Sequence, residues 1–224
     1  MKRQKLSERK LPHYTKGEEI FNMVSHIVGG VVGITALSLC VIFSALHKNI
    51  LGVVSSAIYG ASMIILYTMS SIYHGLRPGL MTKKVFQVID HCSIFLLIAG
   101  TYTPITLSAL HVNNPALAWT IFGIIWGIAI IGITFNSIDL KAYKTFSAIC
   151  YLIMGWCIVF AWKPTVAALG TGGIWLLLAG GIAYTIGALF YYFFKKKKYM
   201  HSVFHIFVVL GSILHMLAIL FYAI

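Results

Sequence analysis

The sequence predicts an all-α fold: a polytopic membrane protein with seven transmembrane helices. Hydrophobic residues make up 59% of the 224 residues and charged residues only 10%, which leaves too little polar surface to cover a water-soluble globule. The apolar residues also form runs of roughly 20, the length that an α-helix needs to cross the hydrocarbon core of a bilayer. A bundle of membrane-spanning helices therefore accounts for nearly the whole chain.

The chain divides into a cytoplasmic basic tail, residues 1–19, and a transmembrane domain, residues 20–224. The predicted spans are 20–45, 52–75, 87–110, 116–136, 144–162, 172–194 and 200–223. The turns that separate them carry polar residues, glycine or proline, at 47–49, 77–79, 112–115, 136–144, 163–164 and 195–198. Pro104, inside the third span, predicts a kink because proline removes a backbone hydrogen bond and crowds the preceding turn.

The distribution of basic residues predicts the orientation. Fifteen of the 17 Lys and Arg residues lie in the tail and in the second, fourth and sixth loops, and only Lys48 and Lys163 lie on the other side. Cytoplasmic loops carry the excess of Lys and Arg, so the N-terminus is predicted to be cytoplasmic and the C-terminus outside. The expected location is the cell membrane. The expected partners are membrane lipids and not nucleic acid, because the basic residues flank apolar helices and attract anionic headgroups.

Four ionisable side chains are expected at one depth, at the cytoplasmic ends of three spans. Such groups are costly in hydrocarbon unless they are paired, hydrated or bound to a metal. His201 and His205 lie four residues apart at the start of the last span, so both rings share one helix face. His74 ends the second span and Asp90 begins the third. Imidazole and carboxylate groups are typical zinc ligands, so these four residues predict a Zn²⁺ site.

Each of these residues also has a simpler interpretation. The histidines could form hydrogen bonds between helices, and Asp90 could interact with the dipole at a helix N-terminus. Ser70, one turn before His74, could bond to a carbonyl of its own helix. In a catalytic site, Asp90 is the expected base that positions a zinc-bound water, and Ser70 is the expected donor to a developing oxyanion.

The spacing of these residues resembles the haemolysin III family. The shared motifs are Glu19-x-x-Asn22-x-x-x-His26, Ser70-x-x-x-His74 with Asp90 sixteen residues later, and His201-x-x-x-His205. The family is the bacterial branch of the progestin and adipoQ receptor family, which is related to the alkaline ceramidases. The resemblance spans all seven predicted helices and leaves only the tail outside it.

The resemblance implies a zinc ion held by His74, His201 and His205, with Asp90 contacting the metal through water. It places Ser70 in the same motif. Eukaryotic relatives bind or cleave lipid amides near this site, which implies attack of a zinc-activated water on an acyl carbonyl.

The other polar residues of the spans are expected to be structural. Glu19, Asn22 and His26 share one face of the first helix, with Glu19 at the edge of the tail. His215 lies about 21 Å from His201 along the last helix, given a rise of about 1.5 Å per residue. This distance is too long for a shared metal, so His215 is predicted to form a hydrogen bond between helices.

Three functions are consistent with these features. The first is a zinc-dependent hydrolase that acts on acyl-amide or related lipids at the cytoplasmic face. The second is a receptor-like or membrane-homeostasis protein in which a structural zinc ties helices together without catalysis. The third is a pore-forming haemolysin that causes cytolysis, as the family name implies. The spans show no repeated polar residues of the kind that line an aqueous pore, which disfavours the third.

Overall fold

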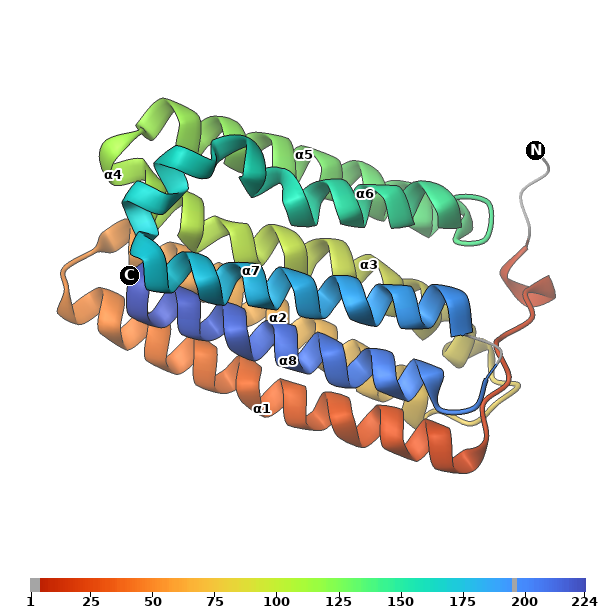
Figure 1. Cartoon of the computed structure of the whole chain (residues 1–224). Coiled ribbons are helices and arrows are strands. Elements are labelled where there is room, and N and C mark those ends of the chain that lie inside the picture. Colours follow the sequence, from red (N-terminus) through yellow and green to blue (C-terminus); the bar gives the residue numbers. More distant parts are fainter. Residues whose placement is uncertain (1–4, 195–196) are drawn as a thin grey trace.

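The computed structural model describes residues 5–194 and 197–224 as helices packed side by side (Figure 1). The long elements are α1 Lys16–Leu46, α2 Ile50–Gly75, α3 Met81–Pro104, α5 Pro115–Asp139, α6 Lys144–Trp156, α7 Trp162–Phe194 and α8 Met200–Tyr222. The short elements are η1 Leu6–Glu8, η2 Ile105–Leu110, α4 His111–Asn113 and η3 Cys157–Ala161. No β-strand occurs among the described residues, so the all-α prediction is confirmed for them.

The number of membrane spans differs from the prediction. Within the described part of the chain, six segments are long and apolar enough to cross a membrane, whereas the sequence predicts seven. The difference arises because the predicted spans 144–162 and 172–194 both fall within one helical segment, Lys144–Phe194. Its first helix, α6, has only 13 residues, fewer than a helix needs to cross a bilayer alone. The short 3₁₀ element η3 joins α6 directly to α7, and α7 itself has a break at Gly170, whose φ of 63° is not helical.

The first helix begins earlier than predicted. α1 starts at Lys16 and not at residue 20, which brings Glu18 and Glu19 into its first turn. The Thr15 hydroxyl accepts the backbone N–H of Glu18, and the Glu18 carboxylate accepts the backbone N–H of Thr15 at 2.8 Å. This reciprocal cap satisfies two donors that a helix N-terminus otherwise leaves unpaired. The cap therefore fixes the first turn of α1.

At Pro104, where the sequence predicts a kink, α3 gives way to a π-helical segment. α3 ends at Pro104, and Ile105–Leu110 continues the helix with π-type hydrogen bonding. Proline cannot donate to the preceding turn and clashes with it, and a π-helical segment is one way in which a helix accommodates such a disruption. All six residues of the segment are buried.

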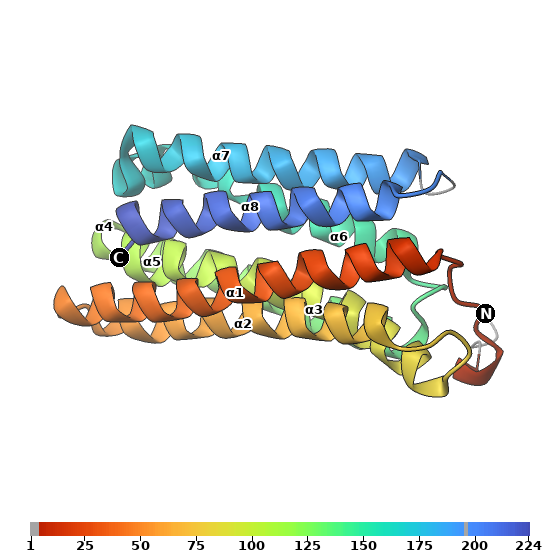
Figure 2. The same ribbon diagram turned by 90° about the horizontal axis from the view of Figure 1, so that it is seen from below.

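The first helix packs against both elements that carry the predicted histidine ligands. α1 contacts α2 and α8, and α7 contacts α8 (Figures 1 and 2). At Gly60 in α2, an added Cβ would lie 2.5 Å from the Cα of Leu37 in α1, so these two backbones touch. The buried face of α1 carries polar and small residues, whereas many of its large apolar side chains are exposed. This pattern suits a helix surrounded partly by lipid.

The N-terminal segment from Lys5 and the C-terminus lie at opposite ends of the bundle (Figure 1). The connections from α2 to α3 and from α5 to α6 lie at the same end as the N-terminus, and α8 begins there. These connections carry basic residues, so the positive charge gathers at one end of the molecule.

Candidate metal centre

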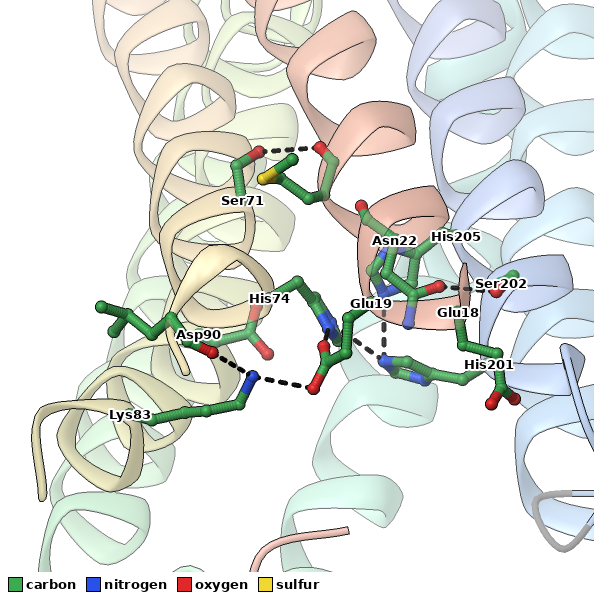
Figure 3. Close-up of polar contacts among 12 residues, drawn as sticks. Glu18, Glu19, Asn22, Ser71, His74, Lys83, Asp90, His201, Ser202 and His205 are labelled. Carbon is green, nitrogen blue, oxygen red and sulfur yellow. Dashed lines mark hydrogen bonds and ion pairs between the residues drawn. The ribbon is translucent and has the colours of Figure 1, made fainter. Parts of the chain in front are cut away.

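Three histidine side chains from two helices converge near the end of the bundle where α8 begins (Figure 3). His74 lies in the last turn of α2, and His201 and His205 lie in the first turns of α8. The Nε2 atoms of His74 and His201 are 3.3 Å apart, and those of His201 and His205 are 3.1 Å apart. One nitrogen from each ring lies within 4.8 Å of the other two. The fold thus brings together the three histidines that the sequence predicts as metal ligands.

Hydrogen bonds to Nδ1 determine which nitrogens of the cluster carry protons. His74 Nδ1 lies 2.6 Å from the Glu19 carboxylate, and His205 Nδ1 lies 3.3 Å from the carbonyl oxygen of Asn22. Both partners are acceptors, so each Nδ1 donates, and in the neutral form of each ring Nε2 keeps a lone pair. A single N–H on His201 Nε2 can satisfy only one of these two lone pairs. A cation bound among the three Nε2 atoms would satisfy all of them.

The donor set and its spacing fit zinc. With Zn–N distances of about 2.0–2.1 Å, two nitrogens of a tetrahedral site lie about 3.3–3.4 Å apart. The observed Nε2 separations of 3.3 Å and 3.1 Å are close to this length. Metal-bound histidines also commonly donate their second N–H to a carboxylate or a backbone carbonyl, as His74 and His205 do here. Three imidazoles leave a fourth position for a further ligand.

Glu19 is a residue of the site that sequence reasoning missed. From the sequence it is expected at the edge of the tail, yet it lies in the first turn of α1 and contacts two groups. One carboxylate oxygen accepts from His74, and the other accepts from Lys83 Nζ at 2.8 Å. Lys83 is 1% exposed and also donates to the carbonyl of Leu76. The motif spacing identifies the helix face of Glu19, but no local signal names its partners in α2 and α3.

The other two residues of the first motif contact α8. The Asn22 side-chain oxygen accepts from the Ser202 hydroxyl at 2.7 Å. The His26 ring stacks on that of His205, with centroids 3.6 Å apart and planes 11° apart. Neither ring nitrogen of His26 has a hydrogen-bond partner among the described residues. The first motif therefore supports two of the clustered histidines directly: Glu19 holds His74, and Asn22 and His26 hold His205.

Asp90 and Ser70 lie outside the three-histidine cluster. Asp90 is in α3, and its carboxylate is not among the ligand atoms that lie within 4.8 Å of one another in the described chain. Its side chain extends toward the side of the cluster where His74 lies (Figure 3), and Asp90 Oδ2 is 3.6 Å from His91 Nδ1. Ser70 is buried in α2, one turn before His74. Their predicted parts in metal binding and catalysis stay predictions.

Tyrosine rings pack around the cluster. The Tyr14 ring, from the segment before α1, stacks on His201 with centroids 5.1 Å apart. Tyr73 packs on His74 at 4.6 Å, and Tyr191 packs on His201 at 5.3 Å. Burial raises the pKa of Tyr14 above its usual range, so the ring that packs on His201 is a neutral phenol even in alkaline solution.

His215 lies apart from the cluster, as the sequence predicts. Its Nε2 donates to the carbonyl oxygen of Leu177 at 3.0 Å, which joins α8 to α7. The ring also packs edge-on against Tyr184 of α7. The predicted hydrogen bond between helices is confirmed.

The chain is similar to known proteins along most of its length. Residues 14–216 match a family model described as haemolysin-III related. Hemolysin-3 of Bacillus cereus is 40% identical over 205 residues, which cover 92% of this chain and 91% of that protein. The Hemolysin-3 homolog of Bacillus subtilis (strain 168) is 38% identical over 211 residues, which cover 94% and 97%. The human monocyte to macrophage differentiation factor is 26% identical over 172 residues, which cover 74% and 69%.

Proposed function

The chain belongs to the haemolysin-III-related family, and from this premise we propose that it is a zinc-binding protein of the cell membrane that hydrolyses acyl-amide or related lipids at the cytoplasmic face. The observation that carries the proposal is the convergence of three Nε2 atoms, two of them on rings oriented through Nδ1. The resemblance to the alkaline ceramidases supports the reaction class.

His74, His201 and His205 are the proposed ligands. Zinc bound there would act as a Lewis acid and lower the pKa of a bound water to about 7. Glu19 keeps the proton of His74 on Nδ1, so that Nε2 stays free to bind a metal. The carbonyl of Asn22 does the same for His205.

Asp90 and Ser70 are the proposed catalytic residues. Asp90 would take the proton from the water that attacks the acyl carbonyl, and would pass it to the leaving amine as the C–N bond breaks. The Ser70 hydroxyl would donate a hydrogen bond to the carbonyl oxygen as negative charge develops on it. The side chain of Asp90 extends toward the cluster from α3 (Figure 3), which supports this division of roles.

The proposed topology has seven crossings, with the N-terminus in the cytoplasm and the C-terminus outside. α6 and α7 run in opposite directions (Figure 1), which supports a reversal of the chain within Lys144–Phe194. The placement of 15 of 17 basic residues on the side of the N-terminus supports the orientation. This topology puts the histidine cluster at the cytoplasmic face.

The burial of the cluster favours a second function, in which zinc is structural. His74 is 2% exposed and His205 1%. An ion held by these rings would tie α2 to α8 without any turnover, as closed zinc sites do. In the catalytic function the fourth position on the zinc is open to water or substrate, whereas in the structural function it is closed to both.

The metal proposal is tested by measuring the metal content of detergent-purified protein by plasma mass spectrometry. We expect one zinc per chain in the wild type and none in the double variant His201→Ala, His205→Ala. His215→Ala is the matched control, because it removes a buried histidine of the same helix that bonds to Leu177 and not to the cluster. Wild-type protein that contains no zinc, when prepared without chelators, would contradict the proposal.

Catalysis requires a second measurement on the zinc-loaded protein. A panel of acyl-amide lipids in vesicles is assayed for release of the free fatty acid. We expect Asp90→Ala to keep its zinc and to lose about 10²-fold or more of the turnover, the usual contribution of a general base. Bound zinc without turnover of any lipid in the panel would favour the structural function.

A further inference from the structure

A second candidate site lies away from the histidine cluster, between the N-terminal segment and the ends of α3 and α5. It is a groove of about 200 Å³ lined by Leu6, Arg9, Val85, Val88, Ile89, Ser137 and Ile138. The side chains that line it are apolar apart from those of Ser137 and Arg9. None of these residues takes part in the proposed zinc site.

The guanidinium of Arg9 lacks a full set of partners. Its Nη1 atom is buried and has no hydrogen-bond partner among the described residues. Burial lowers the pKa of Arg9, while the Asp139 carboxylate acts in the opposite direction. Arginine nevertheless stays protonated in proteins. A positive charge with an unpaired N–H in an apolar lining is costly unless an anion binds it.

Asp139 is an acidic group that attracts Arg9, and it also accepts hydrogen bonds in the turn after α5. Its Oδ1 accepts the backbone N–H groups of Lys141 and Ala142 at 3.0 and 3.1 Å. These bonds hold the carboxylate in the turn. Nη1 of Arg9 still has no hydrogen-bond partner among the described residues, so it can bind a further anion.

The side chains that form the walls of the groove are partly exposed on the outer surface of the bundle. Val85, Ile89 and Ile138 are 39%, 36% and 43% exposed. All three lie inside segments that are apolar enough to span a membrane, near the ends where such segments meet the interface. The volume is below the roughly 300–1,000 Å³ of typical small-molecule sites. It would accommodate a headgroup and part of a chain, with the rest of the chain in the bilayer.

The N-terminal segment that carries Arg9 is attached at two points. Lys84 Nζ donates to the carbonyl oxygen of Ser7, and Thr15 forms the cap of α1. Arg9 lies between these attachments, so its position over the groove is fixed by the fold. Arginine suits anionic oxygens because its planar donors match carboxylate and phosphate geometry.

We propose that this groove binds an amphiphile with an anionic oxygen headgroup, which Arg9 holds while Val85, Val88 and Ile89 contact its hydrocarbon chain. The headgroup is the phosphate of an anionic phospholipid or the carboxylate of a fatty acid. The proposal goes beyond the zinc site and does not depend on it.

Native mass spectrometry of the detergent-purified full chain tests the proposal. The protein is titrated separately with phosphatidylglycerol, oleate and phosphatidylcholine. We expect binding of phosphatidylglycerol, oleate or both to exceed that of phosphatidylcholine, and Arg9→Gln to weaken it about tenfold. Lys10→Gln is the matched control, since it removes a neighbouring exposed charge and should leave binding unchanged.

A second variant keeps the test decisive if Arg9→Gln folds poorly. Val85→Trp fills an exposed part of the groove and leaves Arg9 in place, and it should also weaken binding. The double variant His201→Ala, His205→Ala should bind these lipids as the wild type does. Equal binding of phosphatidylcholine and the anionic lipids would overturn the proposal, and so would equal losses in Arg9→Gln and Lys10→Gln.

Discussion

At the scale of single residues, the orientation of His74 depends on Glu19. Glu19→Gln removes the negative charge that holds Nδ1–H of His74 at 2.6 Å, and it also leaves the buried ammonium of Lys83 without its carboxylate partner. Loss of such a partner typically weakens metal affinity about 10–100-fold. We expect a decrease of this size in zinc affinity, measured by competition with a chelator. Glu8→Gln is the control, because it removes an exposed carboxylate outside α1; equal affinities in all three proteins would refute this role of Glu19.

Some residues of the site can be predicted from the sequence, and others cannot. His201 and His205 are four residues apart, so one helix face contains both, and His74 shares their depth once the spans are drawn. Glu19 and Lys83 give no such signal, because their meeting depends on α1, α2 and α3 packing side by side. Lys83 also satisfies the positive-inside pattern, so its sequence context favours an exposed loop position over its observed burial.

At the scale of the helices, the contact between α1 and α2 depends on the absence of a side chain at Gly60. Gly60→Ala would place a Cβ 2.5 Å from the Leu37 backbone, and such overpacking costs about 1–3 kcal/mol. We expect a lower melting temperature in detergent. Gly123→Ala is the control, because nothing lies within 4 Å of its added Cβ and removing a helical glycine stabilises by about 0.5–1 kcal/mol. Equal melting temperatures for the two variants would show that the backbones separate without cost.

The element boundaries show where hydropathy alone is insufficient. Long apolar runs predict the helices well, but the start of α1 at Lys16 lies in a polar stretch and is set by the Thr15 cap. The boundary between the fifth and sixth predicted spans is ambiguous for the opposite reason. The chain from Lys144 to Phe194 contains only Lys163 and Pro164 as a turn signal, and its helix is interrupted by η3 and by the non-helical backbone of Gly170.

At the scale of the whole molecule, α1 links the two halves of the metal centre. It contacts both α2 and α8, and it supplies Glu19 to His74 and Asn22 to His205. The ligands thus come from helices more than a hundred residues apart in sequence, and the groups that orient them come from a third. Local sequence patterns predict the ligands, whereas the orienting contacts require the packing of the bundle.

The number of crossings is the property of the whole molecule that an experiment can decide most directly. With seven crossings, a fluorescent protein fused to the N-terminus would be bright in the cytoplasm of a bacterial host, and alkaline phosphatase fused to the C-terminus would be active outside. Truncated fusions after Lys141 and after Lys163 isolate the contribution of α6 and η3, and they should report opposite sides of the membrane. If α6 does not cross, both truncations report the same side, and the termini then face the same compartment. That result would leave six crossings and would contradict the proposed topology, which places the two termini on opposite sides of the membrane.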